Sequence, residues 1–274
     1  MNDSMIRDIS LAEEGLQRIR WVGKFMPALN ALKRDFINNQ ALKGKTIVMS
    51  IHLEAKTAYL ALTLQSAGAD VIVTGSNPLS TQDPIAAGLV NQGITVYAWH
   101  GCTDEEYTMF LNKALDHMPH IIIDDGGDLV HLLHSNRTDA KKNLIGGSEE
   151  TTTGIYRLKA LEKENKLAFP MIAVNDSYCK YLFDNRYGTG QSVWDGVIRS
   201  TNLTVTGKTV VVAFRFSCQL ALRYIGHSYH ICSPKPKCLY FRRSLKSWSF
   251  RTYICTIRMN SNFIFHSSLN NHIP

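Results

Sequence analysis

The segment 174–192 contains a lysine and an aspartate spaced so that both can reach one ligand. Lys180 and Asp184 are four residues apart, so on a helix their ammonium and carboxylate groups emerge on the same face. The apolar run 169–174 before them is typical of a buried strand, and α/β folds bind polar ligands beyond the carboxyl ends of such strands. The pair therefore indicates a polar ligand site. The alternative is a surface ion pair, which the spacing alone also explains.

Three neighbours of this pair predict the local backbone. Ser177 can cap the helix, because its hydroxyl accepts hydrogen bonds from the free N–H groups of the first turn. Gly188 and Gly190 predict a tight reversal after the helix, since glycine adopts backbone angles that other residues avoid. Such a turn also lets the backbone approach a ligand closely.

Polar residues also follow most of the buried strands that the sequence predicts. They are His52 after the first strand, Asn77 after the second, Asp124 and Asp125 after the fourth, and Asn175 and Asp176 after the fifth. No rule of secondary structure requires this placement, and ligands of parallel sheets bind at the carboxyl ends of the strands. We therefore expect a ligand site at that edge of the sheet. For His52 the alternative is a strand-end histidine whose ring bonds a backbone carbonyl.

The elements that position these residues alternate between strand and helix. Apolar runs predict strands at 46–51, 69–74, 95–98, 120–124, 169–174 and 209–213. Helices are predicted at 8–36, with a break or kink at Met26–Pro27, and at 55–67, 84–91, 104–118 and 190–202. This alternation indicates a doubly wound α/β fold, in which helices cover both faces of a mostly parallel sheet.

Two patterns predict how helices begin. Ser10 and Glu13 have the spacing of a capping box. In the segment 149–153 two glutamates precede three threonines, so carboxylates can meet the helix dipole while hydroxyls cap free N–H groups. Capping explains this segment, and a ligand-binding role is the alternative.

Charge is unevenly distributed along the 274 residues, whose formal net charge is +7. Residues 214–274, here called the tail, contain nine Lys and Arg residues and no Asp or Glu. Residues 1–213 carry a net charge of about −2. Nucleic-acid binding inferred from the overall charge would therefore depend on the tail alone, and we expect none.

The same composition argues against a membrane or secreted protein. No apolar stretch reaches the roughly 18 residues of a membrane span, and no opening run resembles a signal peptide. Residues 1–213 contain only two cysteines, Cys102 and Cys179, which suits a reducing compartment. We expect a cytoplasmic protein.

Five blocks of sequence, in order, resemble the S-adenosylhomocysteine hydrolase (adenosylhomocysteinase) family. The longest is Asn-Asp-Ser-x-x-Lys-x-x-Phe-Asp-Asn-x-Tyr-Gly-Thr-Gly-Gln-Ser at 175–192. The others are His-Leu-Glu-Ala-Lys-Thr at 52–57, Ser-Asn-Pro-Leu-Ser-Thr-Gln-Asp at 76–83, Asp-Asp-Gly-Gly-Asp-Leu at 124–129 and Ser-Glu-Glu-Thr-Thr-Thr-Gly at 148–154. The resemblance covers about residues 8–213, and five ordered blocks are more specific than any single motif.

The resemblance implies reversible hydrolysis of S-adenosyl-L-homocysteine to adenosine and homocysteine in the methyl cycle. In the family a tightly held NAD oxidises the ribose 3′-hydroxyl, which makes the 4′ proton acidic. The homocysteine thiolate then leaves, water adds, and the ketone is reduced again. The implied partners are these small molecules and the other subunits of a tetramer.

Site residues follow from the same resemblance. Lys180 and Asp184 would grip the 3′ and 2′ hydroxyls, with Lys180 as the proton acceptor. Asp125 would be the base at the 4′ carbon, and Glu150 a ribose ligand. His52 would be the acid–base group near the leaving sulfur. The positions that touch the nicotinamide end of NAD would be Thr151, Thr152, Thr153 and Asn185.

The sequence departs from the family pattern in two places. Glu54 and Lys56 stand where some branches have a threonine and a glutamate near adenine, which leaves the adenine contacts open. After Ala213 the family continues with a Gly-x-Gly-x-x-Gly turn that brings the pyrophosphate of NAD to a helix N-terminus. Here no glycine occurs before Gly226.

We therefore predict three parts. Residues 1–189 form a substrate-binding α/β domain, and 190–213 form a hinge helix and the first strand of a truncated Rossmann-type NAD-binding domain. The tail is an aberrant or disordered basic segment without a packed core, of the composition that a frameshift or a read-through intron produces. We do not expect this chain to form the family tetramer.

The tail also contains histidines and cysteines that could suggest zinc. His227, His230, Cys232 and Cys238 lie close together in sequence, but their spacing matches no closed four-ligand pattern. We expect no metal.

Two functional hypotheses remain open from the sequence. In the first, the chain is an adenosylhomocysteinase-type enzyme. In the second, it is a non-catalytic remnant that binds adenosine-like ligands or a full-length partner. The glycine-free stretch after Ala213 favours the second for this polypeptide.

Overall fold

The computed structural model describes residues 3–204, 210–212, 230–231, 253–259 and 263–269, the last four ranges by their backbone alone. The chain divides into two compact units, Met1–Asn175 and Asp176–Pro274. The predicted domain boundaries at residues 189 and 213 stay predictions.

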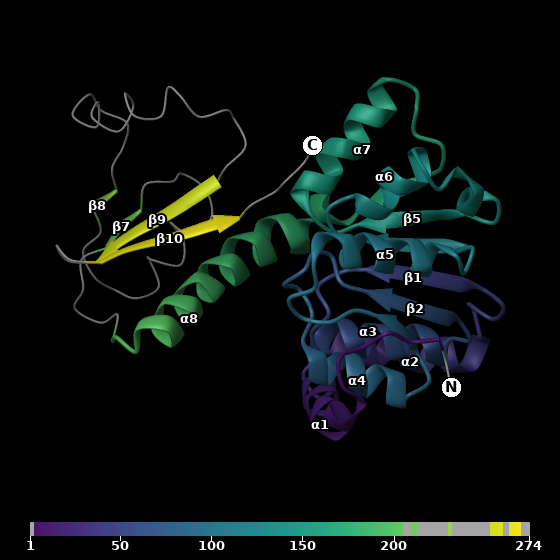
Figure 1. Ribbon diagram of the computed structural model, residues 1–274, viewed down its shortest axis with the longest axis horizontal. Coiled ribbons are helices and arrows are strands. Elements are labelled where there is room, and N and C mark those ends of the chain that lie inside the picture. Colours follow the sequence, from purple (N-terminus) through teal and green to yellow (C-terminus); the bar gives the residue numbers. More distant parts are fainter. Residues whose placement is uncertain (1–2, 205–209, 213–229, 232–252, 260–262, 270–274) are drawn as a thin grey trace. The chain divides into compact units, whose positions relative to one another are not determined.

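The first unit is built on a six-stranded sheet in which every pair of neighbouring strands is parallel (Figure 1). The strands are β1 (Thr46–Ser50), β2 (Asp70–Thr74), β3 (Thr95–Tyr97), β4 (Ile121–Asp124), β5 (Gly146–Glu149) and β6 (Met171–Ala173). Their order in the sheet is β3-β2-β1-β4-β5-β6. The strand order therefore reverses between β1 and β4, and ligands of open α/β sheets bind in the crevice at the carboxyl edge of such a reversal.

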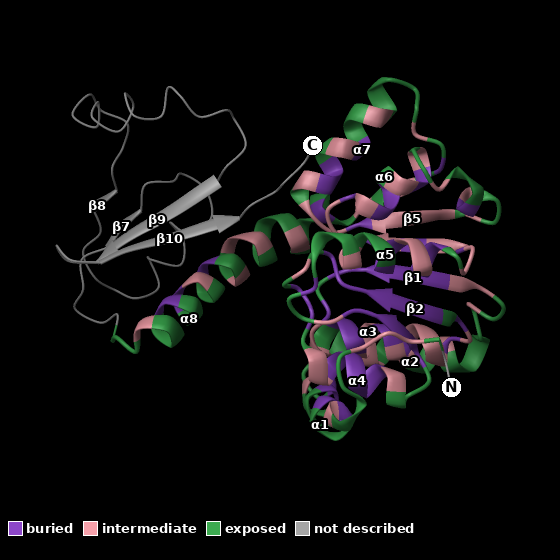
Figure 2. Ribbon diagram, in the orientation of Figure 1, coloured by how far each residue is buried: buried purple, intermediate pink, exposed green. Residues whose placement is uncertain are grey.

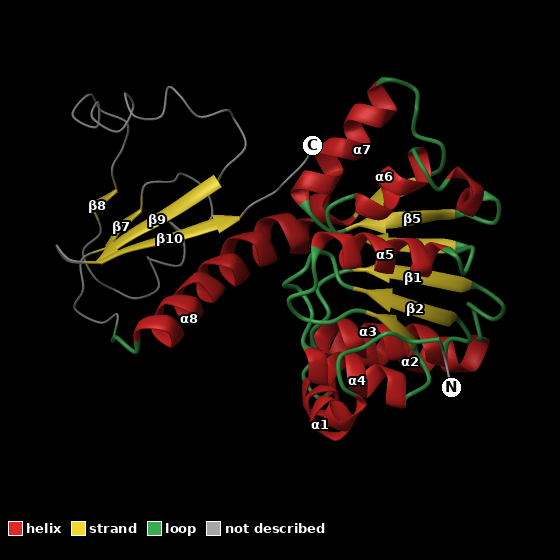
Figure 3. Cartoon of the chain, viewed as in Figure 1, coloured by secondary structure: helices red, strands yellow, loops and turns green. Residues whose placement is uncertain are grey.

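Helices connect these strands (Figure 3). They are α1 (Ala12–Gly23), α2 (Pro27–Asn39), α3 (Ala55–Ser66), α4 (Asp83–Asn91), α5 (Asp104–Leu115), α6 (Asp128–His134) and α7 (Thr152–Lys163). Short 3₁₀ turns occupy Ile9–Leu11, Thr138–Lys141 and Val174–Asp176. The predicted α/β fold class is thus confirmed.

The core has two parts, one on each face of the sheet, because successive side chains of a strand point to opposite faces. Ile47 and Met49 of β1 pack in a cluster with residues of α1, α3 and α4. Val48, between them, packs in a separate cluster with residues of α5, α6 and α7. Figure 2 shows the resulting burial of β1 and β2. Burial on both faces explains why these strands are continuously apolar.

The predicted break or kink at Met26–Pro27 is a break, because α1 ends at Gly23 and α2 begins at Pro27. Pro27 begins α2, since proline lacks an N–H and suits the first helical position. The predicted capping box at Ser10 and Glu13 is wrong. Asp8 accepts a hydrogen bond from the Ser10 N–H at 2.8 Å and caps the preceding 3₁₀ turn instead.

Strand β5 and helix α6 were not predicted. The first two residues of β5 are Gly146 and Gly147, and glycine is depleted in strands. A Cβ added at Gly147 would lie 2.4 Å from Ile122 Cγ1 and 2.8 Å from the Met171 sulfur. Residue 147 must therefore be glycine, because the strands on both sides leave no room for a side chain. Strand propensity, which depends on the local sequence, does not reveal such a requirement.

The second unit begins with a continuous helical segment. A π-helix, Cys179–Gly188, leads directly into α8 (Thr189–Thr201). The predicted reversal at Gly188 and Gly190 is wrong, since Gly188 has helical angles of φ −62° and ψ −47°. The predicted cap is also wrong: no side chain caps this helix, and Ser177 instead contacts the Cys179 sulfur at 3.5 Å.

Four strands of the second unit form a separate sheet in the order β10-β9-β7-β8. They are β7 (Val210–Val212), β8 (His230–Ile231), β9 (Tyr253–Met259) and β10 (Phe263–Leu269). Strand β7 confirms the predicted strand at 209–213. The side chains of the tail, including the four candidate zinc ligands, lie outside the described residues.

Among the residues that the structure describes, no helix combines the length and apolar character needed to cross a bilayer.

The close packing around β5 predicts that Gly147→Ala destabilises the first unit by about 1–3 kcal/mol, because the new methyl group overpacks the contact with β4 and β6. Urea denaturation followed by circular dichroism measures this. Gly196→Ala is the matched control, since a Cβ there meets no atom within 4 Å. We expect it to be neutral or stabilising by about 0.5–1 kcal/mol. An unchanged unfolding midpoint for Gly147→Ala would contradict the packing of β5.

Candidate functional site

The site at the strand reversal begins with two residues that follow neighbouring strands. His52 comes after β1 and Asp125 after β4, and His52 Nε2 lies 3.6 Å from Asp125 Oδ2. The His52 side chain is 62 % exposed, whereas that of Asp125 is 12 % exposed. The ring thus lies beside a carboxylate at the edge of the sheet where the sequence predicts a ligand site, and that site stays a prediction.

Asp124, the last residue of β4, lies beneath this pair and is fully buried. Its Oδ1 accepts a hydrogen bond from the Asp125 N–H at 3.1 Å, and its Oδ2 accepts one from the Val130 N–H at 3.0 Å. The Asp124 carboxyl therefore ties the loop after β4 to the first turn of α6. This fixes the backbone from which Asp125 projects toward His52.

Glu149, the last residue of β5, makes the equivalent contacts one strand further along. Its Oε1 accepts hydrogen bonds from the Gly126 and Thr151 N–H groups, each at 2.9 Å. A Cβ added at Gly154 would lie 2.1 Å from the Glu149 carboxyl carbon. Gly154 is therefore the residue that lets α7 pack over this buried carboxyl.

Burial dominates the electrostatics of these two acids. It raises the pKa of Asp124 well above its ordinary value, and the nearby charge of Glu149 raises it further. It raises the pKa of Glu149 to about 7, against the opposing effect of the hydrogen bonds from Thr151 and Gly126. Burial thus opposes the ionisation of both acids, whereas the next residue after Asp124, Asp125, is partly exposed.

A third aspartate, Asp128 at the start of α6, makes contacts with the neighbouring helices α5 and α7. Asp128 Oδ2 accepts a hydrogen bond from the Tyr107 hydroxyl at 3.1 Å, and its Oδ1 lies 2.7 Å from Arg157 Nη1. Burial and the Asp128 charge raise the pKa of Tyr107, so its hydroxyl stays a donor. These contacts join α5, α6 and α7 around the loop.

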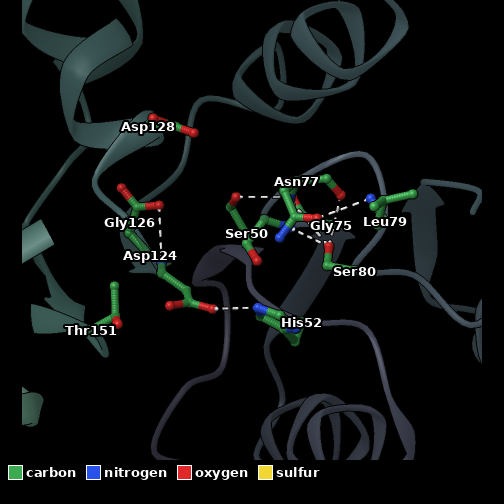
Figure 4. A network of polar contacts seen from close by, with 12 residues as sticks. Ser50, His52, Gly75, Asn77, Leu79, Ser80, Asp124, Gly126, Asp128 and Thr151 are labelled. Atoms are coloured by element: carbon green, nitrogen blue, oxygen red, sulfur yellow. Dashed lines mark hydrogen bonds and ion pairs between the residues drawn. The ribbon is translucent and has the colours of Figure 1, made fainter. Parts of the chain in front are cut away.

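The loop after β2 closes the site on its other side (Figure 4). Ser80 Oγ accepts hydrogen bonds from the Ser76 and Asn77 N–H groups at 2.9 and 3.1 Å, and it donates to the Asn77 carbonyl at 2.9 Å. Ser50, at the end of β1, donates to the Gly75 carbonyl at 3.1 Å. The polar residues of this loop therefore hold its own backbone in place.

The predicted nicotinamide-side threonines are at the start of α7. Thr151 is the N-cap residue, but no side chain caps the helix, so the predicted capping by hydroxyls is wrong. Thr152 Oγ1 instead donates to Asn175 Oδ1 at 3.3 Å. Glu150 is fixed through its backbone, whose N–H donates to the Asp124 carbonyl at 3.0 Å. Thr153 is half-buried in the first turn of α7.

The charged pair of the second unit forms as the spacing predicts. Lys180 Nζ lies 2.7 Å from Asp184 Oδ2 and 3.0 Å from Asn185 Oδ1. The π-helix, with its i→i+5 bonds, brings residues four and five positions on beside the same lysine. The Lys180 side chain is 18 % exposed and that of Asp184 59 % exposed. That this pair meets His52 and Asp125 in one cleft stays a prediction, since they belong to different units.

Comparison with known proteins decides the family. The model of the family described as S-adenosyl-L-homocysteine hydrolase matches residues 3–145 and 136–273. The chain belongs to this family. The second match extends through the tail, so the prediction that the resemblance ends near Ala213 stays open.

Curated relatives of this hydrolase family agree. The chain is 58 % identical over 208 residues to S-inosyl-L-homocysteine hydrolase of Methanocaldococcus jannaschii, covering 76 % of this chain and 50 % of that protein. It is 56 % identical over 211 residues to adenosylhomocysteinase of Pyrococcus abyssi, covering 77 % and 50 %. It is 56 % identical over 214 residues to adenosylhomocysteinase of Thermotoga maritima, which covers 77 % of this chain and 53 % of that protein. The chain thus spans about half the length of the curated relatives it matches.

The region after β7 does not fit the pyrophosphate of the NAD that the hydrolase family implies. Dinucleotide-binding folds place a Gly-rich turn after a strand of a mostly parallel sheet. Here β7 has one parallel neighbour, β8, and one antiparallel neighbour, β9. No glycine occurs between Ala213 and Gly226 to let the backbone approach a phosphate closely.

Within the described part of the chain, no group of three or more His, Cys, Asp or Glu side chains is placed to hold a metal ion.

Sequence reasoning missed the structural importance of Glu149. It placed this residue in a helix start, whereas Glu149 ends a strand and lies in register with Asp124. The only signal was the run of small residues around it, Gly146, Gly147 and Gly154, which leaves room for a buried acid.

The contact between Gly154 and Glu149 predicts that Gly154→Ala destabilises the protein by about 1–3 kcal/mol, because the methyl group overlaps the buried carboxyl and displaces its hydrogen bonds. Thermal unfolding measures the loss. Glu162→Ala, an exposed change on the same helix, is the control and should stay within about 0.5 kcal/mol. Equal stability of the two variants would show that α7 does not pack over Glu149.

Proposed function

We propose that this chain binds the nucleoside part of S-adenosyl-L-homocysteine or a close analogue at the carboxyl edge of β1 and β4, and does not hydrolyse it by itself. The observation that carries the proposal is the His52–Asp125 pair, 3.6 Å apart at the strand reversal of a hydrolase-family fold. Binding sites of open α/β sheets lie at this position.

The two residues of the pair suit different tasks. Asp125 is largely shielded from water and its backbone is tied down by Asp124, so its carboxylate can accept a hydrogen bond in a fixed direction or take up a proton. His52 is exposed and can exchange a proton with a group of the ligand. In this proposal Asp125 faces the 4′ carbon of the ribose, and His52 lies toward the leaving sulfur.

The remaining predicted contacts extend the same proposal. Lys180 and Asp184 offer a donor and an acceptor from one helix face, which suits the 3′ and 2′ hydroxyls of a ribose. Glu150 would bind the ribose from the segment after β5. Thr151, Thr152, Thr153 and Asn185 would lie at the nicotinamide end of NAD.

The proposed lack of turnover follows from the chemistry. Loss of the thiolate requires a ketone at the 3′ carbon, and NAD supplies that oxidation when it is bound. The residues after β7 do not offer the pyrophosphate a glycine turn. Without the oxidation, the 4′ proton stays non-acidic however well Asp125 is placed.

The relatives differ in the purine base of the compound for which they are named. One is named for S-inosyl-L-homocysteine and others for the adenosyl compound. In this chain Glu54 and Lys56, at the sequence positions implied for the base, form an ion pair of 3.3 Å. A carboxylate and an ammonium can complement either purine edge, because each edge has one donor and one acceptor. Both nucleosides therefore belong in the binding experiment.

We expect the purified chain to bind adenosine or inosine, and Asp125→Asn to weaken that binding roughly tenfold, because a charged acceptor becomes neutral. Isothermal titration calorimetry with each nucleoside measures the dissociation constants. Asp70→Asn is the control: this exposed carboxylate begins β2 at the opposite edge of the sheet, and its loss should leave affinity unchanged. No binding of either nucleoside, or equal affinity for both variants, would contradict the proposed site.

We further expect the purified chain to carry no stoichiometric NAD and to release no homocysteine from S-adenosyl- or S-inosyl-homocysteine. The cofactor content is measured after denaturation of the protein, and homocysteine by thiol titration with an active adenosylhomocysteinase as positive control. Stoichiometric NAD together with multiple turnovers would overturn this and establish the full hydrolase activity instead.

A further inference from the structure

Two buried acidic residues end neighbouring strands of the sheet next to the site. Asp124 and Glu149 are register partners on the neighbouring strands β4 and β5, so their side chains leave the same face of the sheet. Both residues are fully buried. Two ionised carboxylates in neighbouring buried positions repel one another and lose their hydration, so one of them is expected to hold a proton.

Among the described residues, none of the charges that shift the pKa values of this pair belongs to a cation. Arg157 of α7 is engaged with Asp128, and His52 faces Asp125. The other titratable groups that contribute to the environment of the pair are acidic or phenolic: Asp125, Asp128, Glu150 and Tyr107. The surroundings therefore favour a single negative charge for the pair, or none.

The hydrogen bonds identify the oxygen that holds the proton. Both oxygens of Asp124 accept backbone N–H groups, and Oε1 of Glu149 accepts two more. Among the described residues, Glu149 Oε2 is buried and has no hydrogen-bond partner. An oxygen that accepts nothing from the protein is the least costly place for a proton, because protonation there breaks no existing bond.

We propose that Glu149 is protonated on Oε2 at neutral pH and that, in this form, Glu149 and Asp124 act as positioning residues for the His52–Asp125 site. The neutral Glu149 anchors the Gly126 and Thr151 backbones, and Asp124 anchors that of Asp125. Ionisation of Glu149 places an unsolvated charge beside Asp124 in the core, and the cost of burying that charge opposes the folded arrangement of the two strand ends. The affinity of the site for a nucleoside therefore depends on a proton that is not exchanged with the ligand.

The direction of the pH dependence follows from proton counting. Glu149 holds its proton to higher pH in the folded chain than in the unfolded chain, whose carboxyl titrates near its ordinary value. The folded state therefore binds more protons between those two values, and stability falls as pH rises through that window. We expect the folding equilibrium constant to drop by up to about 100-fold between pH 5 and pH 8 from this group.

The first experiment observes the proton without any ligand or variant. In protein labelled with ¹³C-glutamate, the Glu149 carboxyl carbon, assigned through its backbone, is followed by NMR from pH 4 to pH 9. A resonance that titrates near pH 7 supports the proposal. One that is already in its ionised position at pH 5.5, like those of exposed glutamates, overturns it.

The second experiment compares stability across the same range. Glu149→Gln keeps the shape and an acceptor oxygen but cannot ionise, so we expect near-parental stability at pH 6 and a flatter decline toward pH 9. Glu162→Gln, an exposed change on α7, should retain the parental pH profile. If Glu149→Gln also keeps the parental profile, the pH dependence does not come from Glu149.

A third measurement, which rests on the proposed function, links the proton to the site. Adenosine or inosine affinity of the parent should weaken several-fold between pH 6 and pH 8.5, and that of Glu149→Gln should change less. If neither protein binds a nucleoside, the proposed function fails while the NMR result still decides the protonation. If both bind with the same pH profile, Glu149 is protonated without positioning the site.

Discussion

The site depends on backbone N–H groups held by two buried carboxyl groups. Asp124 and Glu149 end neighbouring strands, and between them they accept hydrogen bonds from the backbones of Asp125, Val130, Gly126 and Thr151. Burying a carboxyl group costs free energy unless hydrogen bonds compensate for the lost hydration. Here the bonds from four backbone N–H groups provide that compensation. Loops without such anchors are usually the least rigid parts of a sheet protein, and here they carry the candidate chemistry.

This arrangement separates positioning from chemistry. Asp124 and Glu149 have no access to solvent and therefore cannot touch a ligand, whereas the side chains of His52 and, to a smaller extent, Asp125 are exposed to solvent. Glycines make the division possible. Gly126 and Gly127 adopt φ values of 121° and 83° that turn the chain after β4, and Gly154 leaves room for the Glu149 carboxyl. The blocks that the chain shares with the hydrolase family contain both the anchors and these glycines.

Family membership and activity are separate questions for this chain. The chain matches the family model, and its first unit has a parallel sheet with polar residues at the strand reversal. The reaction also needs an oxidant, and the sequence after β7 lacks the glycines that bring a dinucleotide phosphate close to a backbone. If the ribose and cofactor contacts come from different segments, as we propose, binding and turnover can be lost independently.

The sequence by itself determined the fold class and one pair of the site. Runs such as Ile47 to Ile51 can be buried only in a sheet covered on both faces, and polar residues at their ends then meet at one edge, as His52 and Asp125 do. Tertiary structure decided the rest. Gly146 and Gly147 form a strand only because β4 and β6 pack against them. Gly188 continues a helix where its isolated preference is a turn. Glu149 is a buried anchor because the chain after β4 brings the Gly126 N–H group to its carboxyl, and such a long-range contact leaves no local pattern in the sequence.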